Sequence, residues 1–334
     1  MSRSSMDMRT LGDGPATGGH ERYDLVLGLG RSGYACARYL HQCGRNVRVN
    51  DSRVMPPNAR RLRRDAPDVE QHLGGFDTAL LDGADRLVVS PGIPMDNALI
   101  STAQAAGLPI VSDIDLFFEQ RRVPVAGITG SNGKSTVTCW LDAVLSAAGR
   151  TSLAGGNLGV PALELLEAPQ PECFVLELSS FQLERSGALP LEVAALLNLS
   201  ADHLDHHGSM AAYAAAKARI FRRARTAVVL RDLAHLVPDD HPNVVTIGTD
   251  EPDAGHYGLG EHEGETWLAR GPERLLPVSA MQLTLKHDQL NALAVLAMAE
   301  AMGLRWPESR RGLTGFAGLP HRVQRVRDHA GVAW

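Results

Sequence analysis

The stretch that decides the fold is GITGSNGKST, Gly127–Thr136, which follows an apolar run and precedes a helical pattern over Val137–Ala148. A glycine-rich turn between a strand and a helix lets successive backbone N–H groups surround phosphate oxygens at the helix N-terminus. In such a loop Lys134 can reach the β- and γ-phosphates of a nucleotide, and the Ser135 hydroxyl can bind Mg²⁺. The segment therefore predicts a P-loop, in a variant form, because Ile128 replaces the first glycine of the strict pattern GxxxxGK[ST].

Apolar runs that alternate with helical patterns extend on both sides of this loop. Such alternation is typical of βαβ units and predicts largely parallel sheets in an α/β protein. The expected strands are Leu25–Leu29, Val47–Asn50, Leu87–Ser90, Ile110–Val111, Val123–Thr129, Phe174–Leu178, Val193–Leu197, Ala227–Leu230 and Val244–Ile247. A doublet, Arg121-Arg122, followed by Pro124 marks a seam, so we expect a disordered leader over 1–22, a first domain over 23–121 and a second over 122–334.

A second glycine-rich turn, GLGRSG at Gly28–Gly33, follows the first expected strand and opens a helical stretch over Tyr34–Cys43. Its backbone N–H groups could hold a diphosphate, and Asp51 ends the next strand, where an acidic residue that contacts a ribose or a base would lie. Two other interpretations remain open for this pair. The glycines could serve only a tight turn, and an NAD-dependent dehydrogenase would carry the same pattern.

Four further segments place polar residues after an expected strand or in the helix that follows it. They are GGNLG (155–159), ELSSFQL (177–183), LNLSADHLDHHG (197–208) and YAAAKARIF (213–221). The carboxyl ends of parallel strands meet in one crevice, where ligands bind. Glu177 is thus a candidate Mg²⁺ ligand, with a helix cap as the alternative. His203, flanked by Asp202 and Asp205, is a candidate site residue, with a purely structural role as the alternative.

The composition excludes several classes of protein. With 334 residues, 44% hydrophobic and 21% charged, the chain suits a globular protein of about two domains. Its net charge of -5 provides no general basic field for nucleic acid or an anionic membrane, and no apolar run approaches the roughly 18 residues that span a bilayer. The cysteines form no CxxC pair and are predicted to be buried, reduced thiols of a cytoplasmic protein; they are Cys36, Cys43, Cys139 and Cys173.

These motifs, in this order, resemble those of the Mur ligases. Besides the four segments above, the resemblance is carried by GLGRSG (28–33), SPGIP (90–94), TGSNGKST (129–136), the extended form ELSSFQLE (177–184) and GLPHR (318–322). It covers about Tyr23 to Trp334, and ELSSFQLE with the D-H-L-D segment favours the branch that adds D-glutamate. The resemblance implies a Rossmann-like N-terminal domain, a P-loop ATPase domain with a parallel sheet, and a ligase of peptidoglycan biosynthesis. Its reaction would join D-glutamate to UDP-N-acetylmuramoyl-L-alanine through an acyl phosphate made with ATP.

The same resemblance assigns roles to individual residues. The candidate catalytic residues are Lys134, His203 and Lys217. The candidate ATP-binding residues are Gly130, Ser131, Asn132, Gly133, Lys134, Ser135, Thr136, His287, Asp288, Asn291 and Arg322. The candidate substrate-binding residues are Gly28, Gly30, Arg31, Ser32, Gly33, Asp51, Ser90, Pro91, Gly92, Asn157 and Ser179. The ligands implied for two Mg²⁺ ions are Ser135, Glu177, His203 and Lys217.

Two of these residues have competing interpretations. Lys217 matches a lysine that family members carry as a carbamate. Without the resemblance, the composition of the sequence would suggest only an ammonium group on a helix surface. Asp288 stands where the family pattern HNxxN has Asn. In one interpretation its side chain faces adenine. In the other it caps its own helix, a role that Asp and Asn fill about equally well.

The family also has a third, C-terminal Rossmann-like domain that binds the incoming amino acid, and the sequence stops about where the linker to it begins. We therefore expect a fragment that lacks this domain, binds the UDP-substrate and Mg·ATP as a monomer, and forms no amide bond by itself. The alternatives are a natural binding module without catalysis and another amide ligase, such as folylpolyglutamate synthase. GLGRSG and SPGIP argue against the latter, and a dehydrogenase leaves Lys134, Glu177 and Lys217 unexplained.

Overall fold

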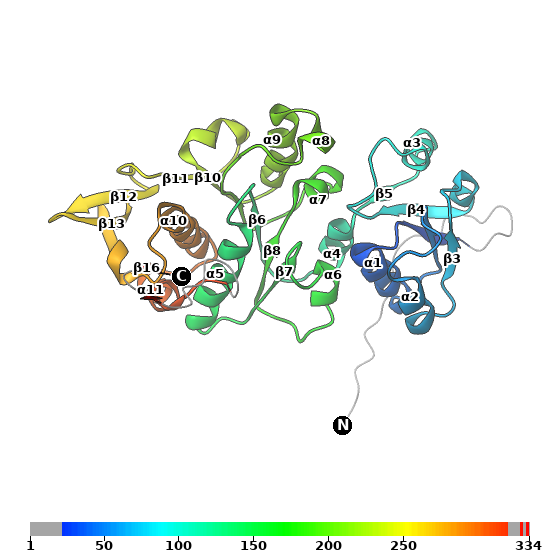
Figure 1. Cartoon of the computed structure of the whole chain (residues 1–334), viewed down its shortest axis with the longest axis horizontal. Helices are drawn as coiled ribbons and strands as arrows, with labels where there is room; N and C mark the ends of the chain where they lie inside the picture. Colours follow the sequence, from blue (N-terminus) through cyan, green and yellow to red (C-terminus); the bar gives the residue numbers. More distant parts are fainter. Residues whose placement is uncertain (1–21, 320–327, 330–331, 334) are drawn as a thin grey trace, which may run out of the picture.

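The computed structural model describes residues 22–319, 328–329 and 332–333, and it contains two main sheets (Figure 1). Sheet A is parallel, with the strand order β3-β2-β1-β4-β5. Its strands are β1 (Tyr23–Leu27), β2 (Val47–Asp51), β3 (Glu70–Leu73), β4 (Ala84–Val89) and β5 (Ile110–Val111). Its helices are α1 (Arg31–Gln42), α2 (Ala59–Asp65), α3 (Ala98–Ala105) and α4 (Asp113–Gln120), with a 3-10 turn at Thr78–Leu81. The strand order reverses between β1 and β4, the point where α/β sheets bind ligands.

Sheet B is mixed and has the order β14-β13-β12-β11-β10-β9-β6-β8-β7. Its strands are β6 (Val125–Thr129), β7 (Ser152–Gly156), β8 (Cys173–Glu177), β9 (Val193–Leu196), β10 (Thr226–Leu230), β11 (Val244–Ile247), β12 (Tyr257–His262), β13 (Glu265–Arg270) and β14 (Glu273–Pro277). The strands from β7 to β12 pair in parallel, and β12, β13 and β14 form an antiparallel extension. The predicted α/β class is confirmed, and the antiparallel extension is an addition to it.

The helices of the sheet B region are α5 (Lys134–Ala147), α6 (Ala162–Leu165), α7 (Ser180–Arg185), α8 (Leu204–His207), α9 (Met210–Ala218), α10 (Lys286–Ala301) and α11 (Trp306–Gly315). Short 3-10 turns lie at Arg219–Phe221, Arg231–Leu236 and Val278–Ala280, and a small pair joins β15 (Asp328–His329) to β16 (Val332–Ala333). None of the helices in the described part of the chain combines the length and hydrophobicity needed to cross a membrane.

The core around α5 fixes the position of the P-loop, which directly precedes this helix. Trp140 on α5 is fully buried and stacks on Phe316, with ring centroids 5.0 Å apart. On α11, Gly312 approaches so closely that a Cβ there would lie 2.4 Å from the Cα of Val144. Truncating a buried tryptophan costs about 3 to 5 kcal/mol. This packing therefore holds the first turn of α5 firmly against its neighbours.

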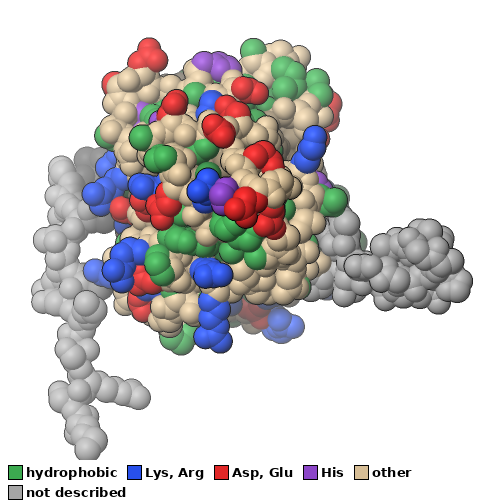
Figure 2. All heavy atoms as spheres, turned by 90° about the vertical axis from the view of Figure 1, so that its left-hand side faces the viewer, with side chains coloured by type: hydrophobic (Ala, Val, Ile, Leu, Met, Phe, Trp, Pro, Cys, Tyr) green, Lys and Arg blue, Asp and Glu red, His purple; other side chains and the backbone are tan. Residues whose placement is uncertain are grey.

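Surface features agree only in part with the sequence-based expectations. All four arginines of the Arg60–Arg64 run are exposed on α2, as is usual for the solvent-facing side of a helix. The expectation of buried thiols is wrong for Cys43, which is exposed because it follows the last turn of α1, and for Cys139, which is half-buried. On the face at the β12–β13 end of the molecule, acidic and basic side chains are interspersed (Figure 2). The expected leader lies outside the described residues, apart from its last residue, Arg22.

Candidate active site

The GLGRSG loop lies at the strand-order reversal of sheet A and requires glycine at two positions. Gly28 has a φ of 89°, which L side chains rarely adopt. A Cβ on Gly33 would lie 1.8 Å from the carbonyl oxygen of Gly28, so the start of α1 packs directly on the loop. After β4, the Ser90 hydroxyl donates to this same carbonyl at 3.0 Å. The loops that contain GLGRSG and SPGIP are thus joined by a hydrogen bond beside the N-terminus of α1.

Asp51 supports the loop from the end of β2. The backbone N–H of Leu29 donates to its Oδ2 at 2.6 Å, and Arg53 donates through Nε to Oδ1 at 2.9 Å and through Nη2 to Oδ2 at 2.6 Å. Burial raises the pKa of Asp51, but these hydrogen bonds outweigh it and hold the pKa below the ordinary value. Its side chain is 2% exposed, against 50% for Arg53. Arg53, which the sequence analysis did not single out, therefore presents the accessible polar group of this pair.

The P-loop lies at the carboxyl end of β6, which is flanked by β8 and β9. Lys134 folds back over the loop, where its Nζ donates to the carbonyl oxygens of Gly130 at 3.0 Å and Ser131 at 2.9 Å. The loop is braced from β9 by Asn198, whose Oδ1 accepts the N–H of Asn132 at 2.8 Å. Asn198 is a further contributor to the site that sequence reasoning missed, although it directly follows the apolar run of β9.

Glu177 and Ser135 form a buried pair of oxygen groups beside the loop. The Ser135 hydroxyl donates to Oε2 of Glu177 at 2.7 Å, and the Asn157 amide donates to Oε1 at 2.8 Å. Glu177 ends β8 rather than starting a helix, while Ser179 caps α7, so the helix-cap alternative for Glu177 is wrong. The structure thus brings three predicted site residues from three different segments into one hydrogen-bonded group.

Lys217 is also brought to the P-loop. Only 2% of this residue is exposed, so it is not the surface ammonium that composition alone suggests. Its Nζ donates to the carbonyl oxygen of Gly130 at 2.9 Å and lies 4.7 Å from the centre of the Tyr213 ring. Burial, and next the nearby Lys134 ammonium, lower the pKa of Lys217 to about 7. A substantial fraction of this side chain is therefore a neutral, nucleophilic amine near neutral pH.

His203 lies outside these hydrogen-bonded groups. It has a φ of 52°, immediately precedes α8, and is about half exposed. Its backbone N–H donates to Asp202 at 3.0 Å, and its ring packs on Phe181 of α7, with centroids 5.0 Å apart. Ser179 forms a capping box with Gln182 at the start of α7, so its hydroxyl already has a structural partner.

The start of α10 approaches the P-loop from another side. A Cβ on Gly133 would lie 2.7 Å from Oδ1 of Asn291, which is itself buried. Asp288 is 7% exposed, and its Oδ2 accepts the backbone N–H of Leu285 at 3.2 Å, so it does cap this helix. His287 is exposed beside it, whereas Arg322 lies outside the described residues.

Loops from the two sheets contact each other directly. The guanidinium of Arg31, in GLGRSG, donates to the carbonyl oxygen of Gly159 in GGNLG. Arg185 on α7 donates to the carbonyl oxygen of Ile93 in SPGIP. The GLGRSG loop thus contacts the GGNLG loop, whose Asn157 is hydrogen-bonded to the expected Mg²⁺ ligand Glu177, and the two sheets contribute to one candidate site.

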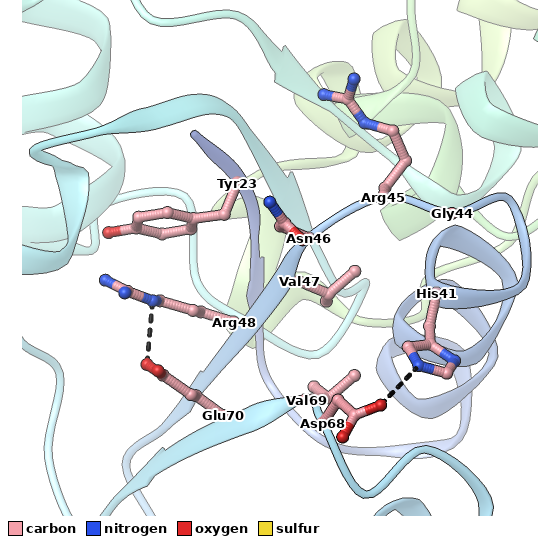
Figure 3. A pocket seen from close by; sticks show the side chains of 10 residues that line it. All are labelled: Tyr23, His41, Gly44, Arg45, Asn46, Val47, Arg48, Asp68, Val69 and Glu70. Carbon is pink, nitrogen blue, oxygen red and sulfur yellow. Dashed lines mark ion pairs between the residues drawn. The ribbon is translucent and has the colours of Figure 1, made fainter. Parts of the chain in front are cut away.

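The cavity in Figure 3 is separate from this site. It has a volume of about 290 Å³ and is lined by residues at the starts of β1, β2 and β3, including Tyr23, Val47 and Glu70. Two pairs of its side chains meet within the cavity, Arg48 with Glu70 at 2.9 Å and His41 with Asp68 at 4.0 Å. Because the starts and ends of parallel strands lie at opposite edges of a sheet, this cavity is on the edge away from GLGRSG.

Comparisons with known proteins match both sheet regions to one family of ligases. Residues 22–112 match the "Mur ligase MurD-like, N-terminal domain" and residues 128–299 match the "Mur ligase middle domain". Solved structures that share the fold include the MPL ligase of Neisseria meningitides, with a TM-score of 0.60 at 21% identity over 89% of this chain and 98% of that one. Another is MurF ligase of Thermotoga maritima in complex with ADP, with a TM-score of 0.54 at 20% identity over 86% of this chain and 67% of that one.

Curated relatives are more similar in sequence. UDP-N-acetylmuramoylalanine–D-glutamate ligase of Nitrosococcus oceani is 48% identical, over 93% of this chain and 69% of that protein. Those of Psychrobacter cryohalolentis and Vibrio parahaemolyticus are each 45% identical, over 92% and 93% of this chain and 66% and 70% of those proteins. The chain thus spans about two thirds of the length of these relatives. It belongs to the Mur ligase family, and the relatives named here are its D-glutamate-adding ligases.

Proposed function

We propose that this chain provides the UDP-substrate and ATP sites of a cytoplasmic ligase that adds D-glutamate to UDP-N-acetylmuramoyl-L-alanine in peptidoglycan synthesis. The observation that carries the proposal is the contact between Arg31 of the GLGRSG loop and Gly159 of the GGNLG loop. A substrate whose diphosphate lies on the first loop would extend along this contact toward Asn157 and the P-loop. Its L-alanyl carboxylate would then reach the nucleotide.

The chemistry follows from bringing two anions together. A carboxylate oxygen of the substrate attacks the γ-phosphorus of ATP, the bond to the β-phosphate oxygen breaks, and an acyl phosphate and ADP form. The amine of D-glutamate then attacks the acyl carbon, phosphate leaves, and the amine loses a proton. The P-loop N–H groups and Lys134 would hold the phosphates and oppose the repulsion between carboxylate and triphosphate. The adenosine would lie beside the start of α10, where it would face Asn291, which packs against Gly133. It would also face the neighbouring His287 and Asp288.

Ser135 and Glu177 fit a Mg²⁺ ion, because they present a hydroxyl and a carboxylate oxygen 2.7 Å apart in a buried position. Magnesium prefers such oxygen ligands and commonly combines one or two of them with phosphate oxygens. Bound Mg²⁺ would supply charge neutralisation at the transferred phosphoryl group. His203 and Lys217 are proposed to serve a second ion.

Lys217 would contribute to that second position as a carbamate. The neutral amine attacks the carbon of CO₂, an N–C bond forms as one C=O double bond of CO₂ becomes a C–O⁻ single bond, and the nitrogen loses one proton. The uncharged amine thereby becomes an anionic oxygen ligand. Its burial beside Lys134 and Gly130 supports this role, since an ammonium would repel a metal ion there. In a full-length form of the enzyme, Lys217→Ala is expected to lose acyl-phosphate formation and to recover part of it when short carboxylates are added.

The proposal is tested by calorimetric titration of the 334-residue chain with UDP-N-acetylmuramoyl-L-alanine and, separately, with Mg·ATP. We expect one site for each ligand. Lys134→Met should weaken Mg·ATP binding by at least tenfold and leave the UDP-substrate affinity unchanged. Hydroxylamine added to the ternary mixture should trap the acyl phosphate as a hydroxamate, which mass spectrometry detects.

The matched control is Arg223→Met, which also removes a cation but from an exposed turn, and it should bind both ligands normally. Failure of the wild-type chain to bind the UDP-substrate, or binding of NADH in its place, would contradict the proposal. Equal affinities of wild type and Lys134→Met for Mg·ATP would remove the P-loop from the mechanism.

A further inference from the structure

Two histidines and a glutamate meet beside the candidate active site. Glu184 on α7 and His206 and His207 on α8 each offer one ligand atom, and these atoms all lie within 4.8 Å of one another. All three residues are half-buried. Neither ATP binding nor the phosphoryl transfer proposed above uses any of them, and α7 and α8 lie side by side in Figure 1. The reaction proposed above therefore gives this cluster no role.

Direct contacts already hold the three groups in place. Nε2 of His206 lies 2.9 Å from Oε2 of Glu184, and Nε2 of His207 lies 3.0 Å from the Ser180 hydroxyl. The two imidazoles pack edge to face, with centroids 4.7 Å apart. Both also contact the Phe181 ring, at 4.6 Å for His206 and 5.6 Å for His207. Packing against Phe181 limits the rotamers of both histidines, so little conformational entropy remains to be lost on binding an ion.

The donor set is that of a transition metal rather than of Mg²⁺. Two imidazole nitrogens and one carboxylate oxygen bind Zn²⁺ with bonds of about 2.0 to 2.2 Å, which places tetrahedral ligand atoms about 3.4 Å apart. The His206–Glu184 pair is already closer than this, and His207 could reach the same geometry by a small shift away from Ser180.

We propose that Glu184, His206 and His207 form a binding site for a zinc-type divalent ion, separate from the Mg²⁺ ligands Ser135 and Glu177. The three protein ligands leave a fourth position for water. Arg185 lies 3.7 Å from Glu184, but its guanidinium is anchored by the carbonyl oxygens of Phe181 and Ile93.

An ion in this site would tie α7 to α8. The segment just before α7 contains Ser179, and His203 directly precedes α8. Occupancy would therefore fix the relative positions of two segments that border the candidate active site. It would do so without any contact between the ion and the P-loop residues.

The test uses Co²⁺ as a spectroscopic substitute for Zn²⁺ in the 334-residue chain. Four-coordinate Co²⁺ absorbs visible light far more strongly than six-coordinate Co²⁺, so the spectrum distinguishes this site from an oxygen-ligated Mg²⁺ site. We expect strong bands that saturate at one Co²⁺ per chain and disappear when Zn²⁺ is added. His206→Asn and Glu184→Gln should each weaken Co²⁺ binding by at least tenfold and abolish the bands.

Two control variants complete the experiment. His262→Asn changes a histidine on β12, and Glu177→Gln removes a proposed Mg²⁺ ligand, and both should retain the bands. Near-ultraviolet circular dichroism of each variant checks that its packing is intact. Only weak, six-coordinate absorption in the wild type, bands that persist in His206→Asn, or bands lost in Glu177→Gln would each overturn the proposal.

Discussion

Lysine is rare in this chain, and its positions are informative. The sequence holds only three lysines, Lys134, Lys217 and Lys286, among 33 basic residues of the Lys and Arg types. Arginine stays charged in proteins, whereas burial readily shifts the pKa of lysine, so only lysine can supply a neutral amine at neutral pH. Lys134 begins α5 and Lys217 lies on α9, but the Nζ atoms of both donate to the carbonyl oxygen of Gly130 in the P-loop. Repulsion between two close ammonium groups lowers the free energy of unfolding, and the size of this effect depends on pH.

We predict that Lys217→Met stabilises the protein against urea at pH 7 in CO₂-free buffer, and that the gain shrinks as the pH rises toward 10. The pKa of Lys217 is lowered from 10.5 to about 7, so between these values the unfolded chain binds more protons than the folded one. Stability of the wild type therefore rises with pH across this window. When the pKa values of the folded and unfolded states differ by one, the free energy of unfolding changes by about 1.4 kcal/mol.

The matched control is Lys286→Met, which removes an exposed lysine and should change stability by an amount that does not vary with pH. A Lys217→Met difference that is constant from pH 7 to pH 10 would contradict the lowered pKa.

A substitution at Asp288 can show how the start of α10 contributes to nucleotide binding. We expect Asp288→Asn to tighten Mg·ATP binding by about tenfold, equivalent to 1.4 kcal/mol. The amide can donate to a ring nitrogen of adenine, which a carboxylate cannot. Its oxygen can still accept the Leu285 N–H, because Asp and Asn cap helices about equally well, so the melting temperature should stay unchanged. Calorimetry at one Mg²⁺ concentration decides the matter, and equal affinities would restrict Asp288 to capping.

At the scale of the elements, the end of β7 positions Glu177. Gly156 has a φ of 97°, and a Cβ there would lie 2.4 Å from the carbonyl oxygen of Glu177. We predict that Gly156→Ala destabilises the protein and weakens Mg·ATP binding, because the added methyl must displace the backbone of a proposed Mg²⁺ ligand. Urea unfolding and calorimetry measure the two effects.

Gly149→Ala provides the comparison. Gly149 also has a positive φ, of 82°, but nothing lies within 4 Å of its added Cβ, so it should lose only the roughly 1 to 2 kcal/mol of left-handed strain. Gly156→Ala should lose more than this. If both variants lost the same free energy of unfolding and Gly156→Ala bound Mg·ATP normally, the contact with Glu177 would affect neither stability nor nucleotide binding.

The same elements show what sequence patterns can predict. The central strands β6, β8 and β9 are buried on both faces and form continuous apolar runs, so their predicted and observed bounds agree within two residues. The edge strand β3, with the sequence EQHL, was missed because it is polar and partly exposed. The antiparallel extension β12–β14 was also missed, because its strands depart from the βαβ rhythm. Edge strands need only one partner and so leave a weaker pattern.

The candidate site was predictable where a glycine motif fixes the backbone conformation, and it was less predictable elsewhere. The loops at Gly28–Gly33 and Gly130–Gly133 lie at strand-to-helix junctions as predicted, since glycines there meet steric limits that few other residues can satisfy. By contrast, nothing in the alanine-rich sequence of α9 signals that Lys217 is buried. The support of Asp51 by Arg53 likewise depends on side-chain geometry that no spacing rule encodes.

At the scale of the whole molecule, a few polar contacts join the two sheet regions. Asp115 on α4 accepts the backbone N–H of Gly187 at 2.8 Å, and Ser112 and Ser186 share a hydrogen bond of 3.1 Å. Arg185 on α7 is 8% exposed and donates to Ile93 in the SPGIP loop. A UDP-substrate on that loop and ATP on the P-loop would therefore act on opposite ends of α7. Binding of either ligand should change the affinity for the other by the same factor.

We predict that Arg185→Met brings this coupling factor close to one while both ligands still bind. The change removes the guanidinium that links α7 to SPGIP, yet the aliphatic part of the side chain can remain packed. The factor is the ratio of the dissociation constants of Mg·ATP measured with and without saturating UDP-N-acetylmuramoyl-L-alanine.

Arg219→Met is the matched control for this measurement. Arg219 also donates to backbone carbonyl oxygens at the end of α7, those of Leu183 at 2.6 Å and Ser186 at 2.7 Å, but both belong to the sheet B region. Its loss should lower stability and preserve the coupling factor. If both variants kept the wild-type factor, the coupling between the two nucleotide sites would not depend on the contact between Arg185 and Ile93.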